Sequence, residues 1–387
     1  MGQDLKPEFR IVIVGGGIAG LCAAIALRGH GRTITILEQS RLNREIGATI
    51  SLQPNASKIV EQRWGMAEAL GKISMRDEGF RIFGTDGKLQ RSIELKTSKY
   101  GADRMVYHRQ DLHEALKDNV RNSCEGKVEI RVSSRVVRCE PEPGIVHLQD
   151  GSSLGADLII GADGIKSALR DEVVGRKISA RPTGFSAYRL SVDTSTLLEE
   201  EAEFCRLVDP KKSMTTMLIA YDRRLIMGPA RNSTIYSVVA LVPDARSTED
   251  KSNSWTTRAA LEDVLRDFES FPAWAKAPFR HADEIGLWQL RDIDALETWQ
   301  KGRVILIGDA AHAMLPTQGQ GASQAVEDAE ALGAFFADMT GRPSREAIRE
   351  RLESVFVSRH DRASTIQSYS RQSARPATAE GDIEVKM

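Results

Sequence analysis

The stretch RIVIVGGGIAGLCAAIALRGHGRTITILEQS, residues 10–40, decides the fold of the first part of the chain. An apolar run comes first, three consecutive glycines follow, and an apolar helical pattern then leads to a second run rich in Thr and Ile. This order predicts a strand over 10–14, a helix over about 18–29 and a strand over 33–37. Two strands joined by a crossover helix form a βαβ unit, in which the strands are parallel.

The glycines of this stretch have the spacing of a dinucleotide-binding turn. In G-x-G-x-x-G, Gly15 permits the tight turn, Gly17 lets a pyrophosphate approach the backbone, and Gly20 lets helix and strand pack closely. The helix N-terminus offers unpaired N–H groups and a positive dipole end to the phosphates. Glu38, at the end of the second strand, can accept hydrogen bonds from ribose hydroxyls, and its charge disfavours a 2′-phosphate. The turn therefore predicts FAD or NAD rather than NADP, against the alternative of a purely structural turn.

The composition is that of an ordinary globular protein. With 387 residues, 41% of them hydrophobic, the chain can bury a large core and is expected to divide into two domains. A formal net charge of −1 gives no general attraction for nucleic acid or an anionic membrane. No apolar run approaches the roughly 20 residues that span a bilayer, and the opening MGQDLKPEFR lacks the apolar core of a signal peptide. We therefore expect a cytoplasmic protein that binds neither nucleic acid nor membranes.

The cysteines indicate neither a metal site nor a disulfide framework. They are scattered, and no two of them form C-x-x-C. The four positions are Cys22, Cys124, Cys139 and Cys205. We expect buried thiols and no metal, and the sequence does not indicate an oligomeric state.

A second strand end carries an acidic residue near the C-terminal third of the chain. GRVILIG, residues 302–308, is a short apolar run typical of a buried parallel strand, and Asp309 follows it. Ligands of open α/β sheets bind at the carboxyl ends of strands, so Asp309 is expected near a cofactor held by the first βαβ unit. A stiff bend with bare amides then leads into a long helix over 322–339. The bend carries Pro316, Gly319 and Gly321.

A third stretch, ADLIIGADGIKSALR, repeats this pattern. An apolar strand leads to Asp163-Gly164, and the pattern predicts a helix that starts at Ile165.

Taken together, these motifs resemble those of the class A, single-component flavoprotein monooxygenases, the salicylate and para-hydroxybenzoate hydroxylase type. The matching segments are GGGIAG with Glu38, GADGIKSALR, GDAAHAMLPTQGQGASQAVEDA and YHRQDLHEAL, and the resemblance covers residues 10 to about 340. The family often has proline where this chain has Ala313, so the loop is expected to be slightly less rigid.

The resemblance implies FAD as the cofactor and a set of contacts to it. They are Arg109 at the ribityl and pyrophosphate region, Asp163 near the phosphate and reductant regions, Asp309 at a ribityl hydroxyl, the amides of Gly321 and Ala322 facing the isoalloxazine ring, and the backbone of Ala48.

The predicted fold class is α/β, a Rossmann-like FAD-binding domain with an inserted antiparallel-sheet substrate domain and a C-terminal helical segment. Residues 79–95 alternate polar and apolar around Asp86-Gly87, which predicts a hairpin, and residues 181–243 read as successive strands. The expected FAD-binding domain comprises 1–75, 100–178 and 285–340, and the substrate domain comprises 76–99 and 179–284. Residues 341–387 are expected to form a C-terminal helix and, after Ser370, a polar tail.

The resemblance also implies a reaction. NADPH or NADH reduces FAD, and the reduced flavin combines with O2 to give a C4a-hydroperoxide that transfers one oxygen atom to a small aromatic or conjugated substrate. Hydroxylation, epoxidation and oxidative dearomatisation are all open. No second G-x-G-x-x-G unit is visible for the nicotinamide, which fits the family's transient binding of it. The alternatives are a flavin-dependent reductase without oxygen insertion and a non-catalytic flavin-binding protein.

Arg189 and Tyr221 are the candidate catalytic residues on the substrate side. The arginine of AYR and the tyrosine of IAYDRRL resemble a pair used by fungal members of the family. An arginine can bind a carboxylate or phenolate with two hydrogen bonds and favour the ionised substrate. The alternative is that Arg189 pairs with a nearby acid while Tyr221 packs in the sheet. Tyr188 should point to the opposite face of its strand from Arg189.

Two histidines and two tryptophans are weaker candidates. His312 and His108 are more often local hydrogen-bonding residues than catalytic bases in such positions. Trp288 and Trp299 are expected to pack in the core, although either could shape the pocket.

Overall fold

The βαβ unit predicted for the first glycine-rich stretch is present in the computed structural model, which describes residues 8–41, 49–122, 126–244 and 255–375. It consists of β1 (Phe9–Val14), α1 (Ile18–Leu27) and β2 (Arg32–Leu37). The two strands pair in parallel from Phe9 opposite Arg32 to Val14 opposite Leu37. All residues of β1 except Arg10 are buried, as expected for a strand covered on both faces.

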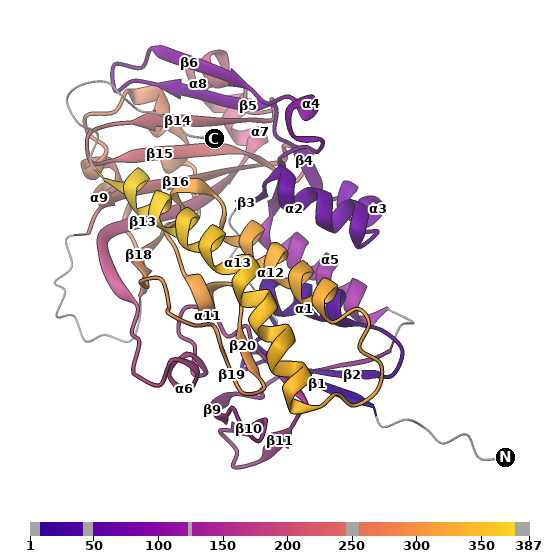
Figure 1. The fold of residues 1–387 in the computed structure, drawn as a ribbon. Coiled ribbons are helices and arrows are strands. Elements are labelled where there is room, and N and C mark those ends of the chain that lie inside the picture. The colour runs from indigo at the N-terminus through magenta and orange to yellow at the C-terminus, as the bar shows by residue number, and fades with distance from the viewer. Residues whose placement is uncertain (1–7, 42–48, 123–125, 245–254, 376–387) are drawn as a thin grey trace.

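A six-stranded sheet forms around this unit. Its order is β19-β20-β12-β1-β2-β8, and every pair is parallel except β19 with β20. The added strands are β8 (Lys127–Arg131), β12 (Leu158–Gly161), β19 (Gln300–Lys301) and β20 (Val304–Leu306). Because β1, β12 and β20 are parallel neighbours, the residues that follow them meet at one edge of the sheet. The helices α1, α5 (Arg109–Arg121) and α12 (Gly321–Phe335) pack beside it (Figure 1).

A second, eight-stranded sheet lies beyond that edge (Figure 1). Its order is β17-β18-β13-β16-β15-β14-β5-β6. The strands are β5 (Gly79–Phe83), β6 (Leu89–Glu94), β13 (Arg181–Asp193), β14 (Met214–Ile219), β15 (Arg224–Ala230), β16 (Ile235–Pro243), β17 (Thr256–Arg258) and β18 (Gly286–Asp292). The predicted hairpin around Asp86-Gly87 is confirmed, since β5 and β6 pair antiparallel across it and Gly87 has a φ of +77°.

This sheet departs from the expected all-antiparallel form at one pair. β5 runs parallel to β14. The chain between them passes through the first sheet, and such a long connection allows parallel pairing, whereas a tight turn enforces the antiparallel kind. β18 pairs with β13 and carries the sheet to Asp292. The sheet thus extends into the stretch 285–340, which the sequence predicts to belong wholly to the FAD-binding domain.

One face of the eight-stranded sheet packs on helices that the sequence did not predict between the strands. This core contains Tyr188, Leu190, Phe204, Leu218 and Phe268. The helices are α7 (Thr194–Glu200), α8 (Ala202–Val208), α9 (Leu261–Asp267), η2 (Ala273–Lys276) and α10 (Ala277–Arg280). The other face turns toward the six-stranded sheet, where Ala187 and Leu241 pack with Leu315 and Ala374.

Shorter elements complete the structure. Two three-stranded antiparallel sheets combine β3 (Thr49–Leu52), β7 (Met105–His108) and β4 (Ser74–Arg76), and β11 (Ser153–Gly155), β10 (Ile145–Leu148) and β9 (Val136–Glu140). The short helices are α2 (Pro54–Lys58), η1 (Ile59–Arg63), α3 (Ala67–Gly71), α4 (Thr97–Tyr100), α6 (Arg170–Val174), α11 (Asp309–His312) and η3 (Pro316–Gln318).

The C-terminal helix α13 (Arg345–Ala374) runs alongside both large sheets (Figure 1). Ser344 caps its N-terminus by accepting a hydrogen bond from the Ala347 amide. Leu352 packs in the core of the first sheet, and Ala374 reaches the second. The helix continues past Ser370, where we had expected the polar tail to begin, and 376–387 lie outside the described residues. In the described part of the chain, no helix is both long and apolar enough to cross a membrane.

Replacing Gly20 by alanine tests the close packing of α1 on β1. A Cβ atom at residue 20 would lie 1.9 Å from the Gly15 carbonyl oxygen, so the helix would have to shift. We expect the free energy of unfolding to fall by about 1–3 kcal/mol, as for other overpacked sites, measured by urea denaturation. Gly71→Ala is the matched control, because no described atom lies within 4 Å of a Cβ there. Equal stability of the Gly20 variant and the parent protein would contradict the packing role.

Candidate active site

The glycine turn after β1 combines crowded and open positions. A Cβ atom at Gly15 would lie 2.3 Å from the Ala162 carbonyl oxygen, and Gly15 has a φ of +106°. At Gly17, in contrast, no described atom lies within 4 Å of a Cβ, and the backbone has an ordinary φ of −75°. Gly17 is the N-cap of α1 and forms no side-chain cap, so the first amides of the helix lack such a partner. Gly15 and Gly20 shape the turn, whereas the space beside Gly17 can receive a phosphate.

Glu38 is held directly over this turn. Its Oε2 accepts a hydrogen bond from the Gly16 amide at 2.8 Å, and its Oε1 accepts one from the Ser40 amide at 2.7 Å. A carboxylate has lone pairs to spare after two such bonds, so it can still accept a ribose hydroxyl. His113, on α5, was not singled out from the sequence. Its Nε2 lies 2.7 Å from the Gly16 carbonyl oxygen and links α5 to the turn.

The second strand end differs from the sequence prediction in its secondary structure. We expected a helix from Ile165, but α6 begins only at Arg170. Asp163 Oδ2 accepts the amides of Ala168 at 2.7 Å and Leu169 at 3.3 Å, which holds the intervening residues in a turn. Burial raises the pKa of Asp163, and its Oδ1 is buried with no hydrogen-bond partner among the described residues. An orphaned buried acceptor is the kind of atom that a bound ligand satisfies.

The third strand end is that of β20, which is followed by Gly308 and Asp309. Gly308 has a φ of +56°, and Asp309 opens α11 with an exposed side chain. Farther along, Gly319 lies where a Cβ would be 3.3 Å from Ser51 Oγ, and a Cβ at Gly321 would meet no described atom within 4 Å. The predicted long helix is present as α12, but it begins at Gly321 and ends at Phe335, four residues before the predicted end at 339. The segments that follow the three strands thus leave open space at two helix N-termini, Gly17 and Gly321.

Arg170 connects two of these strand ends, a role that the sequence did not reveal. Its side chain is 1% exposed, and its guanidinium donates only to backbone carbonyls among the contacts described here. The acceptors are Ile165 at 2.9 Å and Gly164 at 3.2 Å on one side, and Ala310 at 2.7 Å and Asp309 at 2.9 Å on the other. Burial lowers the pKa of Arg170. An arginine inside an apolar segment such as SALRDEVV was the available signal.

Arg109 and Arg189 lie near each other. Arg109 is the first residue of α5, directly after β7. Arg189 lies on β13, and burial, together with the positive charge of Arg109, lowers the pKa of the Arg189 guanidinium. Its Cζ lies 5.3 Å from the centre of the Trp288 ring, and its Nε is buried with no hydrogen-bond partner among the described residues.

Of the remaining predicted flavin contacts, Ala48 lies outside the described residues.

The surroundings of Arg189 on the sheet are apolar. A row of directly paired residues crosses the face that Arg189 occupies, namely Val239, Ile226, Met217 and Ile82. All except Ile82 are only half-buried. Tyr188 points to the opposite face, as predicted, where its hydroxyl donates to Asp267 Oδ2 at 2.7 Å. The face therefore offers an apolar surface and one guanidinium to a ligand.

Tyr221 lies in the turn between β14 and β15, and its side chain is 66% exposed. It borders a recess that Phe185 and Ala374 also line. Leu241, which also lines this recess, pairs with Ala187, two residues from Arg189 along β13 and therefore roughly 7 Å away. Among the described residues, no contact between Tyr221 and Arg189 is found.

The remaining candidates, two histidines and two tryptophans, contact other side chains of the protein. His312 is buried, and its Nε2 lies 2.6 Å from Asp328 Oδ2. His108 is buried 3.7 Å from Asp111. Trp299 is buried against the His312 ring, whereas Trp288 is half-buried beside Arg189.

The chain has extensive similarity to known proteins. It matches the model of a family described as FAD binding domain over residues 8–368. Salicylate hydroxylase of Pseudomonas putida is 33% identical over 387 residues, which cover 95% of this chain and 86% of that protein. Hispidin-3-hydroxylase of Neonothopanus nambi is 30% identical over 385 residues, covering 95% and 90%. A solved salicylate hydroxylase substrate complex has a TM-score of 0.82 at 27% identity, with 97% of this chain and 91% of that chain covered.

Gly17→Ala separates ligand binding from folding. Because no described atom crowds a Cβ there, we expect the melting temperature of the ligand-free protein to change by less than about 2 °C. The methyl group would occupy space that a pyrophosphate needs, so the dissociation constant for FAD should rise about tenfold or more. Flavin fluorescence titration measures it. An unchanged FAD affinity would place the pyrophosphate elsewhere.

Arg170→Lys tests the connection between the two strand ends. Lysine keeps the charge but cannot reach four carbonyls in a planar fork, so buried carbonyls lose their donors. We expect the free energy of unfolding to fall by about 2–3 kcal/mol, measured by urea denaturation of the ligand-free protein. The exposed Arg176→Lys, whose side chain contacts Glu297 at 3.4 Å, is the control and should have little effect. A similarly small loss for both variants would contradict the connecting role.

Proposed function

The chain belongs to the family of flavoproteins with this FAD-binding domain, and on that premise we propose that it is an FAD-dependent monooxygenase. The proposed reaction inserts one oxygen atom from O2 into a small aromatic or conjugated substrate, with NADH or NADPH as electron donor. The observation that carries the proposal is the adjacency of two features. Open helix N-termini gather at one sheet edge, and an apolar sheet face with Arg189 lies close enough to Arg109 for their charges to interact.

Each part of FAD can be assigned to residues at this sheet edge. Gly17 and the N-terminus of α1, in the turn that Gly15 and Gly20 shape, would hold the pyrophosphate, and Glu38 would accept a ribose hydroxyl. Arg109 would contact the ribityl and pyrophosphate region, and Asp309 would bind a ribityl hydroxyl. The amides of Gly321 and Ala322 at the N-terminus of α12 would face the ring system and stabilise negative charge on it. We also retain Asp163 and Ala48 as proposed contacts.

When bound, the flavin would supply the redox chemistry, accepting a hydride from the nicotinamide and activating O2 for oxygen transfer. The protein's task is to bind and orient the substrate and to exclude water. The half-buried row of Val239, Ile226 and Met217 would pack against a flat apolar ring. Exclusion of water matters because it prevents the oxidising equivalents from being lost as hydrogen peroxide.

Arg189 would bind an acidic group of the substrate. Its buried Nε has no partner in the described residues, and a second cation, Arg109, lies nearby. Two cations at one apolar surface stabilise a carboxylate or phenolate, and ionisation of a phenol raises the electron density of its ring. Tyr221 also remains a proposed substrate contact, with less support than Arg189, because its side chain is largely exposed.

A reductase that inserts no oxygen and a non-catalytic flavin-binding protein are the competing functions. Named hydroxylases and monooxygenases among the similar proteins favour the monooxygenase. The deciding experiment supplies 18O2 and NADPH or NADH to the FAD-loaded protein with candidate phenols, indoles and polyketides. Substrate-stimulated O2 consumption with one labelled atom in the product supports the proposal. Nucleotide oxidation that leaves the product unlabelled supports the reductase, and a flavin that neither nucleotide reduces supports a binding protein.

We further propose that the FAD-binding domain and the substrate domain have the boundaries expected from the sequence, except that the substrate domain extends to Asp292. We also propose that the protein is cytoplasmic.

Arg189→Ala tests the substrate role. We expect kcat/KM for an acidic substrate to fall about 100-fold, the value of a charge-assisted hydrogen bond with its desolvation, while the FAD dissociation constant stays within about twofold of the parent. Arg181→Ala, on the same strand but exposed and paired with Asp294, is the matched control. Steady-state kinetics with an acidic substrate and its neutral ester measure the effect. Equal losses for acid and ester would contradict anion recognition by Arg189.

A further inference from the structure

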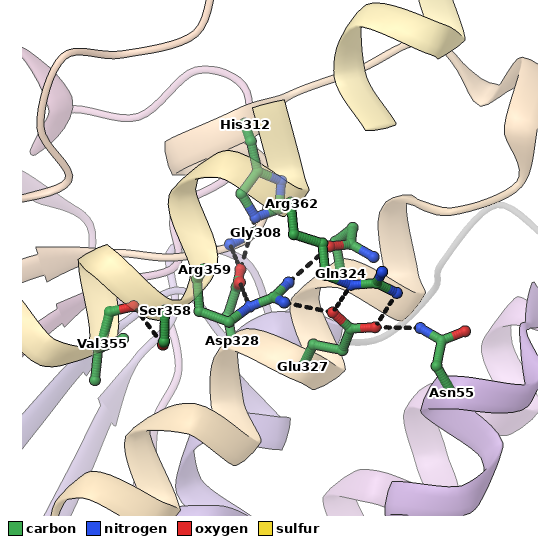
Figure 2. A network of polar contacts seen from close by, with 10 residues as sticks. All are labelled: Asn55, Gly308, His312, Gln324, Glu327, Asp328, Val355, Ser358, Arg359 and Arg362. Carbon is green, nitrogen blue, oxygen red and sulfur yellow. Dashed lines mark hydrogen bonds and ion pairs between the residues drawn. The ribbon is translucent and has the colours of Figure 1, made fainter. Parts of the chain in front are cut away.

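A buried polar network joins the C-terminal helix to the end of strand β20. Figure 2 shows it around Asp328, which lies on α12 between α13 on one side and Gly308 on the other. Asp328 and His312 are almost fully buried, and so is Arg359 of α13. Polar side chains far apart in sequence thus converge where the cofactor-binding stretch begins.

Asp328 holds two groups at the end of β20. Its Oδ2 accepts a hydrogen bond from the Gly308 amide at 3.0 Å and lies 2.6 Å from His312 Nε2. Burial alone would raise the pKa of Asp328, but His312, Arg359 and the Gly308 amide outweigh it and hold the pKa below its usual value. The carboxylate is therefore ionised. Gly308 and His312 bracket the helix α11, whose first residue is Asp309.

Arg359 is the cation that compensates this carboxylate. Its Nε donates to Asp328 Oδ1 at 3.0 Å, and its Nη2 donates to Gln324 Oε1 at 2.6 Å. Its Nη1 also donates to Glu327. One planar guanidinium therefore fixes three side chains of α12, a geometry that lysine cannot reproduce. Arg362, one turn later on α13, contacts Glu327 alone in this network and is half exposed.

We propose that Arg359 is a positioning residue for the cofactor: through Asp328 it fixes the Gly308 amide and His312, and so sets the place of Asp309. The proposal rests on the proposed function, in which Asp309 contacts the flavin. It makes the C-terminal helix part of the cofactor site although α13 contributes no side chain to the open space at Gly17 or Gly321 among the described residues.

The contacts of Arg359 are not needed merely to hold α13 against the rest of the protein. Other contacts hold α13 in place, including Leu352 and Val355 in the core and Gln367, whose Nε2 donates to the carbonyls of Ile293 at 2.8 Å and Ala313 at 3.0 Å. A buried ion pair adds little net stability compared with well-packed apolar residues. What the charged pair adds here is a fixed acceptor for one particular amide, Gly308.

The main test uses Arg359→Lys, which keeps the positive charge and avoids an uncompensated buried carboxylate that could prevent folding. We expect the FAD dissociation constant to rise about tenfold, and the Gly308 amide to lose protection in hydrogen exchange of the ligand-free protein. The melting temperature should stay within about 3 °C of the parent. Arg362→Lys is the control and should change neither the FAD affinity nor the protection. Parent-like affinity and protection in Arg359→Lys would overturn the proposal.

Two replacements of His312 provide an independent measurement. His312→Phe keeps a ring against Trp299, whose ring centre lies 5.1 Å away, but removes the donor to Asp328. His312→Gln keeps a donor. We expect weaker FAD binding in the Phe variant and at least partial rescue in the Gln variant, and equal affinity in both would count against positioning through Asp328.

Asp309→Ala distinguishes this proposal from the proposed function. If Asp309→Ala leaves FAD affinity unchanged, the assignment of Asp309 to the flavin fails, and the positioning role fails with it. If Asp309→Ala weakens FAD binding and Arg359→Lys does not, the flavin assignment stands and only the role of Arg359 is overturned.

Discussion

The parallel pairing of β1, β12 and β20 is the constraint on which the rest of the structure depends. It brings to one edge three segments that are far apart in the chain. Where strands end, backbone N–H and C=O groups lose their partners in the sheet and must find others. At this edge two buried charged side chains provide them, since Arg170 donates to carbonyls of two segments and Asp328 accepts the Gly308 amide. The positions left open, Gly17 and Gly321, are those that a ligand can use.

The two buried charges are stabilised in different ways. Arg170 donates to backbone carbonyls, and the carboxylates of Asp163, Asp171 and Asp309 stabilise its charge without a described hydrogen bond. Asp328 has a full counter-ion in Arg359 and a second polar contact in His312. Both residues nevertheless fix backbone groups where a strand ends, Arg170 through carbonyls and Asp328 through the Gly308 amide.

Local patterns predicted the elements that depend on neighbours in sequence. The βαβ unit, the hairpin around Asp86-Gly87 and the opposite orientations of Tyr188 and Arg189 follow from periodicity and turn chemistry. The helix predicted from Ile165 was wrong because Asp163 binds the amides of Ala168 and Leu169, an interaction that competes with helix formation. The parallel pairing of β5 with β14 and the contacts of Arg359 could not be predicted from the sequence, because they join residues that no local pattern connects.

The two candidate residues on the substrate side differ in their surroundings. Both residues are candidates from the sequence, but a hairpin turn leaves Tyr221 exposed, whereas Arg189 is half-buried on an apolar face of β13 with its Nε fully buried. A guanidinium in such a place is costly, and the nearby Arg109 increases the cost. An arriving anion offsets that cost, because it satisfies the buried Nε and neutralises charge in a medium of low dielectric constant. Arg189, whose charged form is disfavoured by burial and by Arg109, is therefore the residue that would select substrates with an acidic group.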